Sequence, residues 1–218
     1  MSELFLGPFV PTSISGCQLW LDGADPAGTG TAPANGATVS TWVDKSGNGR
    51  NAAAVVAGVY SSAQKSIRFS GTNYYNTPYT AAPTTETLFI VFHLIDYSTG
   101  NPFMITGTTC GGRKVAMYSS EGRFGGGTVC VVWASVTTSL VTTGSNTLGV
   151  SVTNGSSNFV SLHGALTLTG PTTGITFTSG TTTSIGGYSG GGQTVPITNG
   201  YIYEIIAYNS VLETLQRQ

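Results

Sequence analysis

Short runs of strand-forming residues recur along the whole chain, each separated from the next by turn residues. No segment between them has the 3.6-residue period of a helix. The run "TLFIVFHLI" is apolar on both alternating faces, which predicts a central strand covered on both sides. The sequence therefore predicts an all-β fold, an antiparallel sandwich or jelly roll. The predicted strands cover residues 17–21, 38–43, 66–70, 87–95, 102–106, 114–118, 128–135, 147–153, 158–164, 165–170, 174–178, 183–188 and 200–209.

The two ends of the chain differ from this pattern. Residues 1–16 form a predicted N-terminal arm, and residues 17–218 form one predicted domain, because no linker or long-period repeat interrupts them. The final segment "SVLETLQRQ" predicts a short C-terminal helix with Ser210 as N-cap and Glu213 at its third position.

Charge is scarce. Charged residues make up 8% of the chain and the formal net charge is −1, against about a quarter charged residues in typical domains. We expect no nucleic-acid partner, because no basic surface is available. No apolar stretch approaches the ~20 residues of a membrane span, and the N-terminus lacks the basic region of a secretory signal. The sequence thus predicts a soluble chain made in the cytosol.

Three cysteines, Cys17, Cys110 and Cys130, cannot all pair within one chain. Their spacing fits no zinc motif. Buried free thiols are the simplest interpretation, and a Cys110–Cys130 disulfide is the alternative.

Four segments, in this order, resemble the laminin-G-like, concanavalin-A-like sandwich family. They are "LWLDGADPA", "VSTWVDKSGNGRNA", "IRFSGTNYY" and "GYIYEIIAYNSVLETLQRQ". The "LWLD" opening is similar to modules in structural proteins of large DNA viruses and phages and in bacterial surface proteins. The resemblance implies a two-layer jelly roll. We expect its core to contain residues such as Trp20, Trp42, Phe69, Leu88, Ile90, Phe92, Trp133 and Ile202.

The segment "DKSGNG" has two interpretations. Asp44, Ser46, Asn48 and Gly49 match the start of a helix–loop–helix calcium site, but position twelve is Val55 instead of the required Glu. We therefore predict a turn, in which Asp44 caps backbone N–H groups and the glycines adopt positive φ. The alternative is calcium bound by Asp44 and Asn48, since related sandwiches often bind calcium through loop Asp and Asn residues. We predict no metal site and no cofactor.

The sequence predicts no enzyme. None of the nine acidic residues forms the close carboxylate pair within one strand that glycoside hydrolases of this fold commonly use. Glu204 is interpreted as a hydrogen-bonded structural carboxylate, and His93 as a core histidine. The match "GYSGG" at 187–191 lacks the following helix and the downstream His of a nucleophile elbow.

Sugar binding needs exposed aromatic rings beside amides and carboxylates. Two predicted loops, 71–80 and 186–193, supply such side chains. The candidate ligand-binding residues are Asn73, Tyr74, Tyr79, Tyr188 and Gln193, and the alternative is that these aromatics fold back onto the rim of the sandwich.

Two functions follow as hypotheses. The first is a non-enzymatic structural protein of a virus particle, located in the virion after assembly in the host cytoplasm and held in many copies by other particle proteins. The second is a carbohydrate-binding adhesion module with glycan partners. We expect no membrane insertion in either case.

Overall fold

The computed structural model describes thirteen segments of the chain: residues 10–80, 85–95, 101–106, 113–118, 123–128, 134–137, 144–154, 157–162, 168–169, 182–187, 189–190, 193–194 and 199–213. For residues 101–137, and for most described residues from 157 to 169 and from 189 to 194, it gives backbone pairing only. No helix in these segments is long and apolar enough to cross a membrane.

Almost all the described regular structure is β-strand, as predicted. One short 3₁₀ turn, η1 (Pro11–Ser13), precedes the strands. The strands are β1 (Cys17–Asp22), β2 (Thr38–Trp42), β3 (Ala52–Ser61), β4 (Ser66–Phe69), β5 (Tyr74–Thr77), β6 (Thr85–Leu94), β7 (Asn101–Thr106), β8 (Arg113–Tyr118), β9 (Arg123–Thr128), β10 (Ala134–Thr137), β11 (Asn146–Asn154), β12 (Ser157–Leu162), β13 (Leu168–Thr169), β14 (Thr183–Ile185), β15 (Ser189–Gly190), β16 (Gln193–Thr194) and β17 (Gly200–Tyr208).

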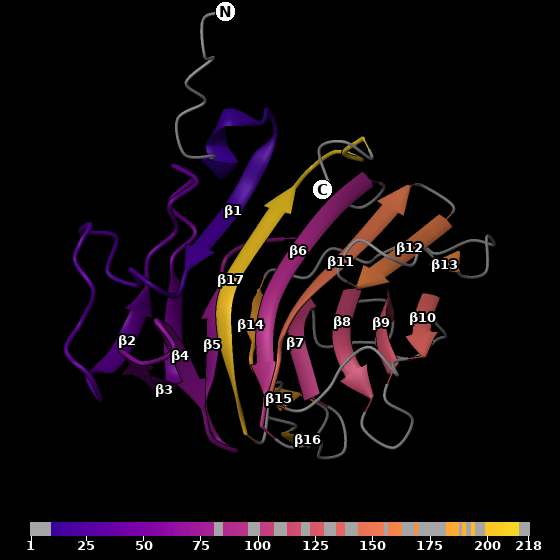
Figure 1. The fold of residues 1–218 in the computed structure, drawn as a ribbon. Helices are drawn as coiled ribbons and strands as arrows, with labels where there is room; N and C mark the ends of the chain where they lie inside the picture. The colour runs from indigo at the N-terminus through magenta and orange to yellow at the C-terminus, as the bar shows by residue number, and fades with distance from the viewer. Residues whose placement is uncertain are drawn as a thin grey trace, which may run out of the picture.

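A continuous antiparallel ladder of 15 strands folds into two layers. The front layer has β17 and β6 at its centre, with β11, β12 and β13 beyond β6. The second layer runs from β3 through β5, β14, β7, β8 and β9 to β10, behind the front layer (Figure 1). The pairing of β3 with β4 joins the two layers at one side. The chain is therefore an antiparallel β-sandwich.

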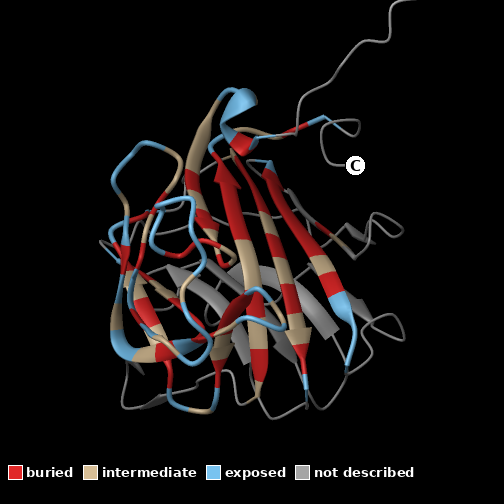
Figure 2. Cartoon of the chain, turned by 60° about the vertical axis from the view of Figure 1, so that its left-hand side comes forward, coloured by how far each residue is buried: buried red, intermediate tan, exposed pale blue. Residues whose placement is uncertain are grey.

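The core lies between the two layers. Along the front strands, buried residues alternate with half-buried ones (Figure 2), because successive side chains of a strand point to opposite faces. Tyr75 is at the centre, packed edge-on against Trp42 and Phe69 with ring centroids 6.2 and 5.8 Å away. Of the predicted core residues, Trp42, Phe69, Leu88, Ile90, Phe92 and Ile202 are buried. Trp20 is only half-buried, on the outer face, and Trp133 lies outside the described side chains.

Five strands were not predicted: β3, β5, β9 and the two-residue strands β15 and β16. The alanine-rich β3 lacks the β-branched composition of a typical strand, and β5 lies in a segment predicted to be a turn. The strand β9 occupies a glycine-rich tract predicted to be a loop. Pairing with other strands holds β3, β5 and β9 in the sheet, and local composition does not reveal that pairing.

The predicted C-terminal helix does not begin where expected. Residues 211–213, directly after Ser210, are not helical, and residues 214–218 lie outside the described ones. Tertiary contacts hold this segment instead, because Leu212 is buried and its N–H donates to the Thr87 hydroxyl at 3.0 Å. A hydrogen bond to a neighbouring strand thus replaces the first turn of a helix.

A second, smaller apolar cluster lies on the outer face of the front layer. Tyr208, Ile206 and Leu212 form it, with Phe89 packed against them. The Tyr208 hydroxyl donates to the Pro11 carbonyl oxygen at 2.9 Å, which ties the N-terminal arm to the last strand. Cys17 packs on the same cluster as a free thiol. Burial, with the nearby Asp44 carboxylate, raises the pKa of this thiol to about 11, so it is unreactive at neutral pH.

Candidate functional site

The loop of residues 44–50 covers the outer edge of β1. One carboxylate oxygen of Asp44 accepts hydrogen bonds from the backbone N–H groups of Trp20 and Ser46, at 3.0 and 2.9 Å. Its other oxygen accepts from the Ser46 hydroxyl and the Arg50 N–H, both at 2.9 Å. The predicted turn is confirmed. Because exposed strand edges invite pairing with other chains, the loop also protects this edge.

Further side chains of the same loop satisfy the backbone of β1. The Gln18 carbonyl oxygen accepts hydrogen bonds from Ser46, Asn48 and Arg50. Gly47 and Gly49 have φ of +88° and +69°, the conformation predicted from the sequence. Among the described residues, no three His, Cys, Asp or Glu side chains gather in a group that could hold a metal ion.

An ion-pair network lies beside this loop. The Lys45 ammonium contacts Asp22 at 2.8 Å and Asp25 at 3.2 Å, and its charge lies 4.9 Å from the Trp20 ring centroid. Burial opposes the charge on Lys45, but the two carboxylates outweigh it and raise its pKa. Burial also acts on Asp25, yet hydrogen bonds from Gly30, Lys45 and Thr29 lower its pKa. Both groups are therefore charged at neutral pH.

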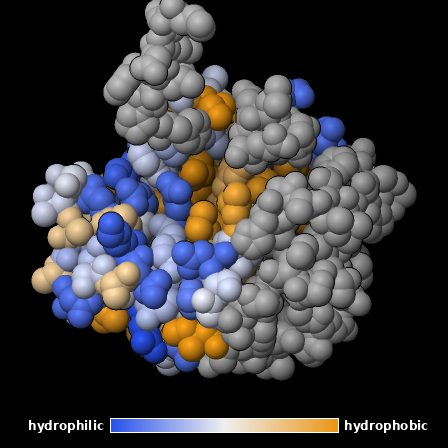
Figure 3. Space-filling view, viewed as in Figure 1, coloured by the Kyte–Doolittle hydropathy of each residue, from blue (hydrophilic) through white to orange (hydrophobic). Residues whose placement is uncertain are grey.

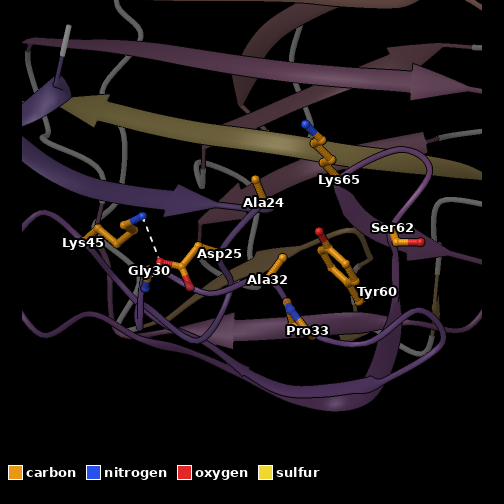
Figure 4. A pocket seen from close by; sticks show the side chains of 9 residues that line it. All are labelled: Ala24, Asp25, Gly30, Ala32, Pro33, Lys45, Tyr60, Ser62 and Lys65. Carbon is orange, nitrogen blue, oxygen red and sulfur yellow. Dashed lines mark hydrogen bonds and ion pairs between the residues drawn. The ribbon is translucent and has the colours of Figure 1, made fainter. Parts of the chain in front are cut away.

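A pocket of about 510 Å³ opens next to this network. We name it the Lys65 pocket. Ala24, Asp25, Gly30, Ala32, Pro33, Lys45, Tyr60, Ser62 and Lys65 line it (Figure 4). Three segments bring these residues together: the long loop between β1 and β2, the Asp44 loop, and the end of β3 with the turn that follows it. Pockets of 300–1,000 Å³ are the size that small ligands occupy.

One residue of β17 interrupts the regular pairing of this strand. In the pairing with β6, Ile202 lies opposite Phe92 and Glu204 lies opposite Val91, so Tyr203 is an extra residue. Such a bulge re-aims side chains. Tyr201 and Glu204 pair with outer-face residues of β6, and the bulge directs the Tyr203 side chain to the same face. The neighbour of β17 changes at the same point, from β4 to β1.

The bulge places Tyr203 among polar and aromatic side chains from distant segments. Its hydroxyl contacts Gln64 and lies 2.9 Å from the Asn146 Oδ1 atom. Nδ1 of His93 lies 3.1 Å from the same oxygen. We name this group the Tyr203 cluster; its members are Gln64, Arg68, His93, Asn146, Tyr201 and Tyr203.

Tyr201 forms the aromatic centre of the cluster. The His93 ring meets it edge-on at 5.7 Å, and the Arg68 guanidinium lies 5.8 Å from its ring centroid. Arg68 also donates to the Asn199 side chain at 3.1 Å. Asn146 is exposed and the other five cluster members are half-buried, so amide, imidazole, hydroxyl and guanidinium groups reach solvent together. Figure 3 shows apolar residues near the centre of this view, with hydrophilic residues to their left.

Two interpretations of single residues are tested here. Glu204 accepts a 2.8 Å hydrogen bond from the Trp20 indole, as expected of a structural carboxylate, and burial raises its pKa. The interpretation of His93 as a core residue was wrong. Its partner residues in the pairing of β6 with β17 and β11 are Tyr201 and Asn146, which places it on the outer face.

The candidate ligand-binding residues do not form one exposed surface. Tyr79 is 1% exposed and its hydroxyl donates to Glu86 inside the protein, while Asn73 is buried and its amide binds the Ala57 and Ser70 backbone. These two therefore lack the exposure that the sugar-binding prediction required. Tyr74 is half-buried in β5. Tyr188 and the side chain of Gln193 lie outside the described part.

Sequence reasoning missed two features of the outer face. Asp22 lies directly opposite Glu204 on the adjacent strand, although 182 positions separate them. Lys45 and the Ala24 N–H occupy the Asp22 carboxylate, so Asp22 belongs to the ion-pair network, while the Trp20 indole donates to Glu204. The Tyr203 cluster was also missed, although "GYIYEIIAY" changes its alternation phase at Tyr203 and thereby signals a bulge.

The fold and the outer face together define a β-sandwich domain with a polar, aromatic surface. No family model matches the chain, and no curated protein matches its sequence. Solved structures do match in fold. One is Trypanosoma rangeli sialidase in complex with sialic acid, at TM-score 0.66 and 15% identity, covering 96% of this chain and 34% of the sialidase.

Botulinum toxins provide further similar structures. Botulinum neurotoxin type C, which enters cells in a manner dependent upon interaction with two ganglioside molecules, matches with TM-score 0.64 and 10% identity over 93% of this chain and 50% of that one. The binding domain of botulinum neurotoxin DC in complex with rat synaptotagmin II matches with TM-score 0.63 and 12% identity over 95% of this chain and 51% of that one. This chain spans only part of each, and these likenesses show the sandwich fold.

Proposed function

We propose that this chain is a non-catalytic carbohydrate-binding domain of the laminin-G-like type, with the Tyr203 cluster as its binding surface. The observation that supports it most is the bulge in β17, which adds Tyr203 to an outer face that already carries Tyr201 and Asn146. Aromatic rings stack on the apolar faces of sugars, while amides and guanidinium groups bind their hydroxyls. The sialidase bound to sialic acid and the ganglioside-dependent toxin share the fold, which adds support to a glycan ligand.

The chemistry of the cluster favours binding over hydrolysis. Hydrolysis of a glycosidic bond needs two carboxylates that flank it. The Tyr203 cluster contains none. Two carboxylates lie beside it, but Lys45 and the Ala24 N–H occupy Asp22, and the Trp20 indole donates to Glu204. The cluster instead offers donors and acceptors without a nucleophile or a proton donor tuned for cleavage.

The test is a glycan array probed with the purified chain, followed by calorimetry on each hit. Tyr201→Ala and Asn146→Ala should each weaken binding at least tenfold, a change of about 1.4 kcal/mol. Tyr74→Ala is the matched control, because Tyr74 is also half-buried but lies in β5, which belongs to the second layer. If only the Tyr74 variant loses binding, the binding site lies at the segment 71–80 and not at the Tyr203 cluster. A protein that binds no glycan on the array would overturn the proposal.

The motif resemblance supports a second proposal, that the domain is displayed in many copies on a virus particle. Its support is the ordered set of segments beginning with "LWLDGADPA", together with the low proportion of charged residues. Contacts of a neutral surface are little screened by salt. The domain should therefore stay with purified particles washed in about 1 M salt, as detected by mass spectrometry. Release by salt alone would contradict this role.

A further inference from the structure

Four residues of the Tyr203 cluster form a row that runs across the strands of the sheet. In the register of the sheet, Tyr201 of β17 lies between Arg68 of β4 and His93 of β6. His93 in turn lies opposite Asn146 of β11. We name these four residues the cross-strand row. Their strands are consecutive neighbours, so the outermost two are about 14 Å apart at about 4.8 Å per spacing.

Each side chain of the row contacts the next one. The Arg68 guanidinium lies 5.8 Å from the Tyr201 ring centroid, within the range of a cation–π contact. The His93 ring meets the Tyr201 ring edge-on at 5.7 Å. Nδ1 of His93 lies 3.1 Å from Oδ1 of Asn146. The row is therefore a continuous line of side chains on the outer face, with an aromatic ring near its middle.

Both ends of the row are open to solvent. Beyond Arg68, the next residue in the register is Val59 of β3, which is 40% exposed. At the other end, Asn146 and residues 144 and 145 before it are exposed. A site for a single small ligand usually encloses most of the ligand's surface. The exposed residues at both ends instead leave room for a ligand that continues past the row.

Polar groups near the two ends of the row have hydrogen-bonding capacity left for a ligand. The Arg68 guanidinium carries several N–H donors, and one of its nitrogens binds the Asn199 side chain. The Oδ1 atom of Asn146 is occupied by His93 and Tyr203, whereas its amide N–H groups bind no described residue. The row thus places donors on both sides of the Tyr201 ring.

We propose that the cross-strand row binds an internal stretch of a linear oligosaccharide, which lies across the strands. The Tyr201 ring stacks on the middle sugar, while Arg68 and Asn146 donate to hydroxyls of the sugars on either side. Because one sugar unit of an extended chain is about as long as one strand spacing, the row matches about three units. This inference rests on the proposed function and adds the kind of glycan that the surface holds.

The first test varies the length of the ligand. The probes are linear oligomers of glucose, mannose, xylose and N-acetylglucosamine with one, three and five units, titrated into the unaltered protein by calorimetry. In at least one series, three units should bind at least tenfold more tightly than one, and five units should add little. Equal affinity for one and three units would overturn the inference.

The glycan array separates failure of this inference from failure of the proposed function. A protein that binds terminal or branched sugars on the array, but none of the linear series, overturns the inference and leaves the proposed function standing. A protein that binds nothing on the array contradicts the proposed function, and this inference with it.

Variants of the row separate ligand binding from a structural role. Arg68→Gln and Asn146→Ala each remove donors at one end, so each should weaken binding of three units by a larger factor than binding of one. Tyr201→Ala should weaken both. Val55→Thr is the matched control, because Val55 is 50% exposed in β3, outside the row, and both affinities should stay unchanged. Equal factors for the two ligands in both end variants would overturn the inference.

A soluble polysaccharide of the series that binds tests whether the bound stretch is internal. A domain that binds internal stretches can occupy many positions along one chain. The amount of protein bound at saturation should therefore follow the mass of polysaccharide and not the number of chains. Titrations with two preparations of different average length measure this. One bound domain per chain at both lengths would show that the protein binds chain ends, which would overturn the inference.

Discussion

The indole Nε1 of Trp20 donates a 2.8 Å hydrogen bond to Oε1 of Glu204, joining the first strand to the last across 184 positions of sequence. The two residues lie on the outer face of the front layer, where β1 pairs with the upper half of β17. This contact lies between the ion-pair network of Lys45 on one side and the bulge at Tyr203 on the other. It therefore links the strands on which the two candidate sites are built.

Glu204→Gln should make stability less dependent on pH. Burial raises the Glu204 pKa above its ordinary value of 4.5 in the folded state. The folded protein therefore binds the proton more tightly than the unfolded chain does. The stabilisation of the folded state by this tighter proton binding is fully present below pH 4.5. It is lost as pH rises through the folded-state pKa of Glu204.

Urea unfolding of both proteins across this range measures the effect. The free energy of unfolding of the wild type relative to Glu204→Gln should fall as pH increases. Because the other titrating groups are common to both proteins, the difference isolates Glu204. A difference that stays constant with pH would contradict the prediction.

Asp44→Ala should lower the free energy of unfolding by about 2–4 kcal/mol, because four hydrogen bonds to one carboxylate are lost and the backbone N–H groups of Trp20, Ser46 and Arg50 lose their acceptor. Denaturant unfolding measures this. Ser46→Ala is the control: it removes one of the four donors to that carboxylate, together with contacts to the Gln18 carbonyl and the exposed Asn48, and should cost about 1 kcal/mol. Equal losses in the two variants would show that Asp44 does not organise the loop.

Removal of calcium should not affect stability. Both Asp44 oxygens already accept hydrogen bonds from the chain, so a cation would have to displace them. A chelator should shift the melting temperature by no more than about two degrees. An increase of roughly ten degrees on adding calcium would instead identify a metal site at this loop.

Gly186→Ala should destabilise the fold strongly. A Cβ atom at Gly186 would lie 2.2 Å from a ring carbon of the buried Phe69, and φ at this position is +77°. Overpacking and backbone strain together predict a loss of about 3 kcal/mol or more. Gly47→Ala is the matched control, because Gly47 has a φ of +88° but open space around it, so only the backbone cost of about 1 kcal/mol applies. Similar losses in both variants would show that the contact with Phe69 is relieved at little cost.

The sequence by itself determined the features that depend on neighbouring residues. The apolar residues on both faces of 87–95 predicted a central strand, and residues 200–209 were predicted as a further strand; the two pair side by side as β6 and β17. The Asp44 turn was also predictable, because most of its hydrogen bonds join residues within seven positions of one another. The role of Glu204 as a hydrogen-bonded structural carboxylate was also predictable, because Glu204 is the only acidic residue in the predicted strand 200–209.

Only the tertiary structure decided where the candidate sites lie. The Tyr203 cluster combines residues from the β3–β4 turn, β4, β6, β11 and β17, and the register of sheet pairing brings them together. Burial of Tyr79 likewise depends on Glu86 and β14, which local sequence does not specify. A strand alternates its side chains whatever its partners are, but the partners and a one-residue bulge decide which distant side chains share its face.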